Sequence, residues 1–174
     1  MKILEQLHSY DQQLLLRCST FRQPLFRCCK TLSHSADGYL YIVFALIYAF
    51  IQPQTGYTFL WLMLCIFFIE RTIYFFLKNT LKRQRPPMVI SGFSSLITAS
   101  DEFSFPSGHT SAAFLFSTLC CLWFDAALVY LTIPWAFSIA FCRVALGVHF
   151  PFDTVAGALI GITIASSGYS LYIS

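Results

Sequence analysis

Two histidines and one aspartate are the residues of this sequence best suited to covalent and acid–base chemistry. His149 and Asp153 lie four positions apart, and Pro151 between them marks the start of a helix, so their side chains can meet within about one helical turn. A carboxylate that accepts a hydrogen bond from one imidazole nitrogen makes the other nitrogen a better nucleophile. His109 comes from a different helix and is free to protonate a leaving oxygen. The sequence therefore predicts a two-step displacement with His149 as nucleophile, Asp153 as the group that orients it and His109 as general acid.

Three cations at the ends of apolar segments indicate what this chemistry acts on. Lys78, Arg85 and Arg143 would repel one another, and each would cost several kcal/mol if it were desolvated without an anion. A phosphate reverses that cost, because its oxygens match the forked donors of arginine and the point charge of lysine. The three residues are therefore candidate phosphate ligands.

Backbone amides complete the expected anion site. Ser107 and Gly108 fall at the N-terminus of an apolar helix, directly after Pro106, which is well placed to start that helix. Free N–H groups and the positive end of the helix dipole favour an anion there, and glycine lets the main chain approach closely. Ser107 and Gly108 are therefore predicted to hold the phosphate oxygens that gain charge in the transition state.

The elements that must position these residues are membrane helices. The 174 residues are 57% hydrophobic and 11% charged, with a mean hydropathy of +0.66, and their 19 Phe, 9 Tyr and 3 Trp suit a lipid-facing surface with aromatic anchors. The predicted fold is all-α, an integral membrane bundle of five to six helices. Five of them span the bilayer, at residues 38–52, 57–77, 107–124, 126–143 and 153–173.

Two more polar segments complete a single predicted domain over residues 1–174. Residues 1–31 combine apolar positions with basic ones at helical spacing, which indicates an interfacial amphipathic helix pair broken at Pro24. Residues 78–106 form the only long connection and are predicted to be an active-site loop. Following the five spans alternately across the membrane brings every candidate site residue to one face.

Charge and cysteine usage exclude other classes of function. A net charge of +3, scattered among apolar runs, gives no nucleic-acid surface and favours anionic lipid headgroups as partners. The seven cysteines show no zinc-ligand spacing and are interpreted as small apolar packing groups. We expect no metal, no cofactor and no obligatory protein partner.

The spacing of the polar residues resembles the three-part signature of the type-2 phosphatidic acid phosphatase superfamily, which also holds soluble acid phosphatases and vanadium haloperoxidases. Its parts are Lys78 with six residues before Arg85 and Pro86, then Pro106 to His109, then Arg143 with five residues before His149 and three more before Asp153. The similarity covers roughly residues 38–173. One departure is Cys142, where the family often has serine before the arginine.

The resemblance implies a metal-independent membrane lipid phosphatase that forms a phosphohistidine at His149 and releases inorganic phosphate. In small size the chain is most similar to compact bacterial undecaprenyl pyrophosphate phosphatases and to phosphatidylglycerophosphatases. Undecaprenyl pyrophosphate, phosphatidylglycerophosphate and phosphatidate are therefore the expected substrates. Two alternatives use the same site: a lipid-phosphate binding or transport protein, and a phosphotransferase that moves phosphate from one lipid to another.

The expected location is the bacterial inner membrane, with two arguments opposed on orientation. Nearly all Lys and Arg lie on the active-site face, and the positive-inside rule would point that face to the cytoplasm. Resemblance to the lipid phosphatases implies the periplasmic side, which we favour.

Other polar residues have simpler interpretations. Glu70 and Arg71, inside the second span, are expected to form an internal ion pair or to contact another helix rather than act as a relay. Asp37 and the nearby Ser33 and Ser35 are expected to cap the first span, although they could touch substrate. Arg83 could steer an anionic headgroup or snorkel to the interface.

Overall fold

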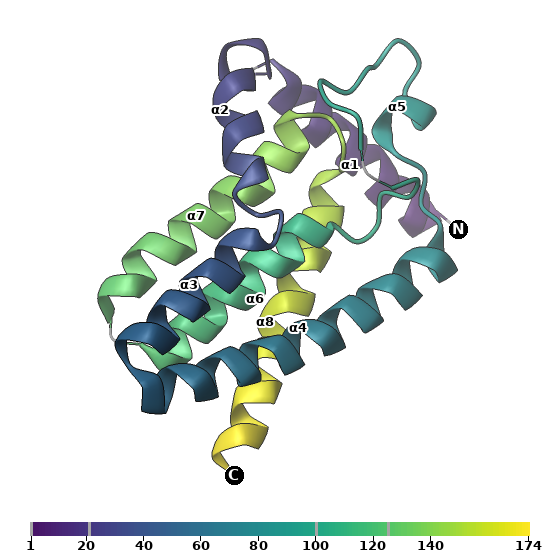
Figure 1. Ribbon diagram of the computed structural model, residues 1–174. Helices are drawn as coiled ribbons and strands as arrows, with labels where there is room; N and C mark the ends of the chain where they lie inside the picture. Colours follow the sequence, from purple (N-terminus) through teal and green to yellow (C-terminus); the bar gives the residue numbers. More distant parts are fainter. Residues whose placement is uncertain (1, 21, 100, 125) are drawn as a thin grey trace.

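The computed structural model describes residues 2–20, 22–99, 101–124 and 126–174. Over these ranges the chain is all-helical, which confirms the predicted fold class, and it contains eight helices without a strand (Figure 1). They are α1 (Lys2–Ser19), α2 (Arg22–His34), α3 (Tyr39–Ile51), α4 (Pro53–Leu81), α5 (Pro86–Val89), α6 (Gly108–Trp123), α7 (Ala126–Ala145) and α8 (Pro151–Ile173).

Helix α6 forms the centre of the bundle. It packs most extensively on α8 and α7, and its residues 110–117 are all buried, as are Leu119 and Cys120. Gly157 and Gly161 of α8 allow close packing, because a Cβ added at Gly157 would lie 2.5 Å from the Ser107 carbonyl oxygen. Small residues four apart let two helix backbones approach in this way. The contact fixes the start of α6 against the start of α8.

Helices α3 and α4 form a hairpin beside this pair. Its tight turn brings Gly56 against the backbone of Ala49, where a Cβ would lie 2.6 Å from the Ala49 nitrogen. Phe59, Met63 and Ile66 of α4 then pack into one apolar cluster with Leu115 and Leu119 of α6. The hairpin therefore holds α4, and with it Lys78, alongside α6.

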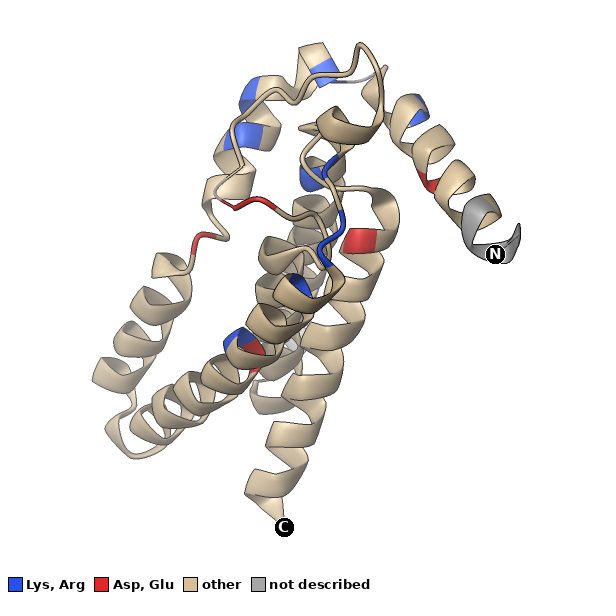
Figure 2. Ribbon diagram, turned by 90° about the vertical axis from the view of Figure 1, so that its right-hand side faces the viewer, with Lys and Arg blue, Asp and Glu red and all other residues tan. Residues whose placement is uncertain are grey.

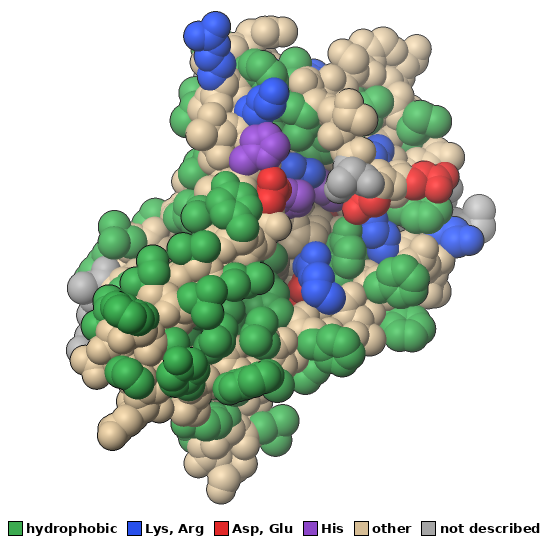
Figure 3. All heavy atoms as spheres, in the orientation of Figure 1, with side chains coloured by type: hydrophobic (Ala, Val, Ile, Leu, Met, Phe, Trp, Pro, Cys, Tyr) green, Lys and Arg blue, Asp and Glu red, His purple; other side chains and the backbone are tan. Residues whose placement is uncertain are grey.

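Among the described residues, three helices are long and apolar enough to cross a membrane: α4, continuing to Val89, residues 128–145 of α7, and α8. A fourth span is possible if α2 and α3, which meet at an angle of 48°, cross as one broken segment. Helix α6, expected as a span, has 16 residues and its surface is covered by other helices. Figure 3 shows hydrophobic side chains covering the lower part of the molecule over α3 and α4. The bundle thus has the expected apolar belt, with fewer full-length spans than the five predicted.

The N-terminal helices differ from the interfacial pair expected at residues 1–31. Helix α2 begins at Arg22 and places Pro24 in its first turn, where a missing N–H costs nothing, so the break precedes Pro24. Helix α1 packs on the bundle rather than lying free, because Asp11 and Leu15 are fully buried against α7 and α8. Residues 1 and 21 of the predicted segment lie outside the described residues.

Charged side chains are concentrated at one end of the bundle, as expected from the alternating crossing of the spans. Figure 2 shows most Lys and Arg at the end that carries α1, α2 and the loop around α5. This loop joins α4 to α6, and the predicted segment 78–106 includes the last turn of α4 and the short α5. Ser100 of that segment lies outside the described residues.

Candidate active site

His149 sits in the short loop between α7 and α8, in a fully enclosed environment. The chain turns at Gly147, whose φ of 76° favours glycine, and the His149 side chain is 2% exposed. Its Nδ1 lies 2.7 Å from the carbonyl oxygen of Ser104. A carbonyl can only accept, so Nδ1 carries the proton and Nε2 keeps its lone pair. Burial lowers the pKa of His149 to about 3, which keeps the imidazole neutral and available as a nucleophile.

Asp153 does not make the hydrogen bond to His149 that the sequence predicted. Its Oδ2 is 3.8 Å from His149 Nδ1, beyond hydrogen-bond range. The same oxygen accepts hydrogen bonds from the Ser104 hydroxyl and, at 2.8 Å, from the backbone N–H of Phe150. Asp153 therefore acts on the imidazole indirectly. It fixes Ser104, and the Ser104 carbonyl accepts the hydrogen bond from His149.

Arg83 joins Asp153 to the N-terminal helix, a role that sequence reasoning missed. Its guanidinium donates to Asp153 Oδ1 at 2.6 Å and to Asp11 Oδ2 at 2.5 Å. It also lies 4.3 Å over the ring of Phe150. The expected interpretations, headgroup steering or snorkelling, do not describe this residue. No local spacing signals the contact, because its partners are about 70 residues away in both directions.

Lys78 and Arg85 form a clamp around a carboxylate that the sequence analysis did not single out. Asp101 Oδ2 lies 2.8 Å from Lys78 Nζ, and Asp101 Oδ1 pairs with Arg85. The Tyr74 hydroxyl adds a hydrogen bond of 2.8 Å to Oδ2, and Arg85 Nε donates to the Asp101 carbonyl at 3.0 Å. Burial alone would raise the pKa of Asp101, but hydrogen bonds from Lys78 and Tyr74 and the two positive charges hold it at about 2. The clamp is thus already occupied by an oxyanion, the carboxylate of Asp101.

Arg143 is the cation that lacks such a partner. Its side chain is buried near the end of α7 and donates to the Ser33 hydroxyl at 2.8 Å. Within the described part of the chain no carboxylate pairs with it, and its buried Nε has no hydrogen-bond partner. Leaving a buried charged donor unpaired costs several kcal/mol. An anion that binds between Arg143 and the clamp would remove this cost.

His149 lies next to these cations. Arg85 donates to the carbonyl oxygen of Val148 at 2.5 Å, and the Val148 amide donates to the Arg143 carbonyl at 3.3 Å. Val148 directly precedes His149, so two cations and the imidazole are tied to the same short loop. The positive charges of Arg143 and Arg85 act on His149 directly. The structure therefore places Arg85 next to Arg143 and His149, as predicted.

The first turn of α6 contains the backbone amides that the sequence predicts to form an anion cradle. Ser107 is the N-cap residue and Gly108 begins the helix, so N–H groups of this turn have no intrahelical acceptor. The Ser107 amide itself donates to the Asp153 carbonyl at 3.0 Å, which fixes the turn against α8. Glycine is required at 108, since a Cβ there would lie 2.9 Å from the Tyr74 ring. The cradle thus sits between α4 and α8, beside Lys78 and Asp153.

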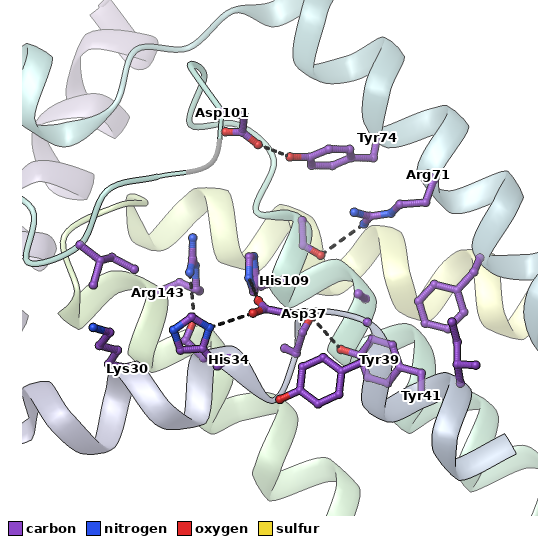
Figure 4. Close-up of a pocket in the computed structure, with 18 of the residues that line it drawn as sticks. Lys30, His34, Asp37, Tyr39, Tyr41, Arg71, Tyr74, Asp101, His109 and Arg143 are labelled. Carbon is purple, nitrogen blue, oxygen red and sulfur yellow. Dashed lines mark hydrogen bonds and ion pairs between the residues drawn. The ribbon is translucent and has the colours of Figure 1, made fainter. Parts of the chain in front are cut away.

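His109 faces a cavity of about 900 Å³ that opens between α2, α3 and α4. Figure 4 shows His109 and Asp37 directed toward each other, with Arg143 and His34 on one side and Arg71 and Tyr74 on the other. His109 Nε2 lies 2.8 Å from Asp37 Oδ1, and His34 Nδ1 lies 2.8 Å from Asp37 Oδ2. Asp37 is therefore a partner of the predicted general acid and not a helix cap. In Figure 3 the charged and His side chains gather around this hollow.

Glu70 and Arg71 form the internal ion pair that the sequence predicted, and they also contact α6. Glu70 is fully buried and accepts hydrogen bonds of 2.5 Å from Arg71 and from Ser111. Arg71 also donates to the Gly108 carbonyl at 3.3 Å. The pair thereby fixes the first turn of α6 to α4, on the side opposite the contact with Asp153.

A membrane-embedded helical bundle with an enclosed histidine and a cationic oxyanion site defines the class of this protein. The chain belongs to the PAP2 superfamily, whose sequence model matches residues 56–173 and so includes every candidate catalytic and phosphate-binding residue. This confirms the family whose motif the sequence resembles. The apolar helices of the chain, its membership of this family and its similarity to membrane phosphatases show that it is an integral membrane protein.

Two curated relatives match parts of the chain. The lipid A 4′-phosphatase of Bacteroides thetaiotaomicron is 34% identical over 104 residues, which are 56% of this chain and 46% of that protein. The bacitracin transport permease protein BcrC of Bacillus licheniformis is 35% identical over 78 residues, 45% of this chain and 38% of that protein. The chain thus spans less than half the length of these relatives.

Two solved structures match nearly the whole chain. LpxE of Aquifex aeolicus has a TM-score of 0.80 at 25% identity and covers 91% of this chain and 93% of its own. The first transmembrane PAP2-type phosphatidylglycerolphosphate phosphatase from Bacillus subtilis also has a TM-score of 0.80, at 22% identity, over 96% of this chain and 86% of its own. The second comparison shows a shared fold.

Proposed function

We propose that this protein is a membrane lipid phosphatase that transfers a phosphoryl group to His149 and then to water. The observation that carries the proposal is the buried, neutral His149 held beside two buried arginines, one of which has no anionic partner in the described chain. A phosphate bound there would supply that partner and present phosphorus to the imidazole. Family membership and the phosphatases among the similar proteins support the same reaction class.

In the first step, the Nε2 lone pair of His149 attacks phosphorus and the bond from phosphorus to the lipid oxygen breaks. His109 donates a proton to that leaving oxygen. Lys78, Arg85 and Arg143, with the amide of Gly108 at the start of α6, stabilise the charge on the three non-bridging oxygens. Because the Ser107 amide donates to the Asp153 carbonyl, Ser107 instead fixes this turn in place. In the second step, His109 accepts a proton from water, the water oxygen attacks phosphorus, and the bond from nitrogen to phosphorus breaks to release inorganic phosphate.

Asp101 takes the place of the phosphate in the clamp. Its carboxylate already contacts Lys78, Arg85 and Tyr74, the groups that face the anion site from α4 and the following loop. Two anions in one clamp repel each other, so substrate must displace this carboxylate when it binds. The clamp cations therefore remain paired before and after each turnover.

The cavity beside His109 supports a lipid substrate. Its polar end carries His109 and Arg143, and its apolar side is lined by Ile42, Met63 and Phe67 from α3 and α4. A headgroup at the polar end would leave its hydrocarbon chain between these two helices, facing the bilayer. Undecaprenyl pyrophosphate, phosphatidylglycerophosphate and phosphatidate all have this shape. Lipid A phosphate joins them because of the Bacteroides relative.

Loss of the nucleophile tests the mechanism. We expect His149→Ala to lower phosphate release by more than ~10³-fold while lipid binding remains, because the clamp is intact. Purified protein would be assayed in detergent against a panel of lipid phosphates and diphosphates, with binding of a fluorescent lipid phosphate as the control. Near-normal turnover by the variant would exclude His149 as nucleophile.

The same assay separates the competing functions and tests metal independence. A transport or binding protein, as the name of the Bacillus licheniformis relative suggests, would bind the lipids without releasing phosphate, and a phosphotransferase would produce a second phosphorylated lipid. We expect activity to persist in EDTA and to be inhibited by vanadate, which adopts the five-coordinate geometry of the transition state. Loss of activity in EDTA with rescue by Mg²⁺ would contradict this expectation.

We propose the periplasmic face of a bacterial inner membrane as the location of the site, in one domain that draws on α1, α2, α4, α6, α7 and α8. Cys28 is exposed on α2, at the end of the bundle that carries the site. An impermeant thiol reagent should therefore label Cys28 in intact cells. Labelling only after the membrane is opened would place the site in the cytoplasm.

A further inference from the structure

We propose that Asp37 is a positioning residue for the general acid, because its carboxylate binds His109 across the cavity. This inference rests on the proposed phosphatase function. Asp37 lies at the break between α2 and α3, just before Gly38, whose φ of 107° favours glycine. The turn directs the Asp37 carboxylate across the cavity to α6, where it meets a residue 72 positions later in the chain.

The two catalytic histidines have chemically different partners. His149 Nδ1 donates to a peptide carbonyl at 2.7 Å, and the Asp153 carboxylate oxygen lies 3.8 Å away, beyond hydrogen-bond range. His109 Nε2 lies 2.8 Å from a carboxylate oxygen, whose negative charge favours the protonated ring. A nucleophile must be neutral and a general acid must carry a transferable proton. The direct carboxylate contact therefore belongs to His109, whereas the carboxylate next to His149 lies 3.8 Å from its ring.

The contact also determines which nitrogen of His109 can reach the substrate. Nε2 is bound to Asp37, and among the described residues no hydrogen bond is made to Nδ1. In the protonated ring, Nδ1–H can therefore donate to the leaving oxygen while Nε2–H stays on Asp37. When the lipid oxygen has taken the Nδ1 proton, the neutral ring can accept a proton from the attacking water at the same nitrogen.

Other charges around His109 make the carboxylate necessary. Burial of the ring disfavours a positive charge on it most strongly, and Arg143 from α7 and Arg71 from α4, which face the same cavity, add to this effect. Glu70 is engaged by Arg71 and Ser111, and Asp101 by the clamp. Asp37 is therefore the described carboxylate that directly contacts His109. His34, on its other oxygen, holds the carboxylate in place from α2.

A purely structural role for Asp37 predicts a different result from a role in proton donation. If Asp37 only ties the α2–α3 break to α6, its loss lowers all activities alike. If it positions the acid, its loss slows the first step only when the leaving oxygen needs a proton. An alkyl phosphate has a poor leaving group that requires protonation, whereas a nitrophenyl phosphate does not.

The test compares Asp37→Asn with the unaltered protein on two substrates with matched hydrocarbon chains, an alkyl phosphate and an alkyl-substituted nitrophenyl phosphate. We expect kcat/KM, which reports the first step alone, to fall ~10²-fold on the alkyl phosphate, in the range of general acid catalysis, and to change by less than ~3-fold on the nitrophenyl substrate. His109→Ala should show the same selectivity. Asp37→Glu, which restores the charge, should recover part of the alkyl phosphate activity.

Equal losses on both substrates, or no loss on the alkyl phosphate, would overturn the inference while the phosphatase function stands. Activity of Asp37→Asn on the nitrophenyl substrate also shows that this variant is folded. If the unaltered protein releases phosphate from neither substrate nor from the lipid panel, the proposed function itself fails, and the inference fails with it.

Discussion

Replacing Asp101 by asparagine should make the protein bind phosphate and vanadate more tightly. The change keeps the shape of the side chain and the contact from Arg85 Nε to the Asp101 carbonyl, at 3.0 Å. It removes the negative charge that pairs with Lys78 at 2.8 Å and with Arg85. With a pKa of about 2, this carboxylate is ionised at any pH used for an assay, so it competes with an incoming oxyanion throughout.

The size of the effect follows from the two ion pairs that a bound phosphate must replace. Asp101 is about one-third exposed, with a side-chain accessibility of 35%, so each pair contributes at most about 1 kcal/mol after solvent screening. The asparagine oxygen still accepts from the donors on one side, which returns part of this, but its NH2 group cannot accept from those on the other side. A gain of about 1–2 kcal/mol corresponds to roughly 5–30-fold tighter binding.

The assay is competitive inhibition of lipid-phosphate hydrolysis by inorganic phosphate and by vanadate. Glu102→Gln is the matched control, since it removes the neighbouring negative charge, which forms no ion pair among the described residues. The inhibition constants of Asp101→Asn should fall, while those of Glu102→Gln should stay within about 2-fold. Unchanged or weaker inhibition in Asp101→Asn would show that Asp101 organises the clamp rather than occupying it.

Two further predictions concern stability. Gly161→Ala places a Cβ 2.8 Å from the Leu115 nitrogen and against the Ser111 carbonyl, so α6 and α8 must separate at a cost of about 1–3 kcal/mol. The control is Gly168→Ala, where the added Cβ meets only the side chain of Ile66. The thermal midpoint of Gly161→Ala in detergent should fall well below that of this control. Equal midpoints would show that the helices do not pack this closely. Burial holds the pKa of His149 at about 3, against 6.5 for an ordinary histidine. Between pH 6.5 and 3 the unfolded chain therefore binds a proton that the folded chain does not, so the free energy of unfolding falls as the pH falls. His149→Gln should therefore lose less stability than the unaltered protein between pH 7 and 4.5, and an equal loss would contradict the buried neutral imidazole.

The helices could be predicted from the sequence because apolar runs and helix-end residues coincide. The third span was expected at 107–124 and is Gly108–Trp123, since proline and glycine precede it and the apolar run ends at Phe124. Helix α4 was expected at 57–77 but runs Pro53–Leu81. Hydropathy marks only the part of a helix inside the bilayer, while backbone hydrogen bonds continue through polar helix-forming residues beyond it.

The candidate residues of the site were predicted, but several of their partners were not. Spacing places His149, Arg143 and Ser107 at helix ends on one face, because each helix end is determined locally. The carboxylates of Asp37 and Asp101 reach the site along loop paths, and no periodic pattern encodes those paths. The same reason explains why spacing pointed to Asp153 as the partner of His149, whereas the folded loop brings the Ser104 carbonyl closer.

Chemical trapping of the phosphorylated protein tests the central claim most directly. The protein would be mixed with a ³²P-labelled lipid phosphate, quenched within milliseconds in alkali and digested, and the labelled peptide identified by mass spectrometry. The account predicts an alkali-stable, acid-labile phosphoryl group on His149, absent from His149→Ala and accumulating when water attack is slowed. A protein that releases labelled phosphate at full rate with no label at His149, or with label on another residue, would contradict it.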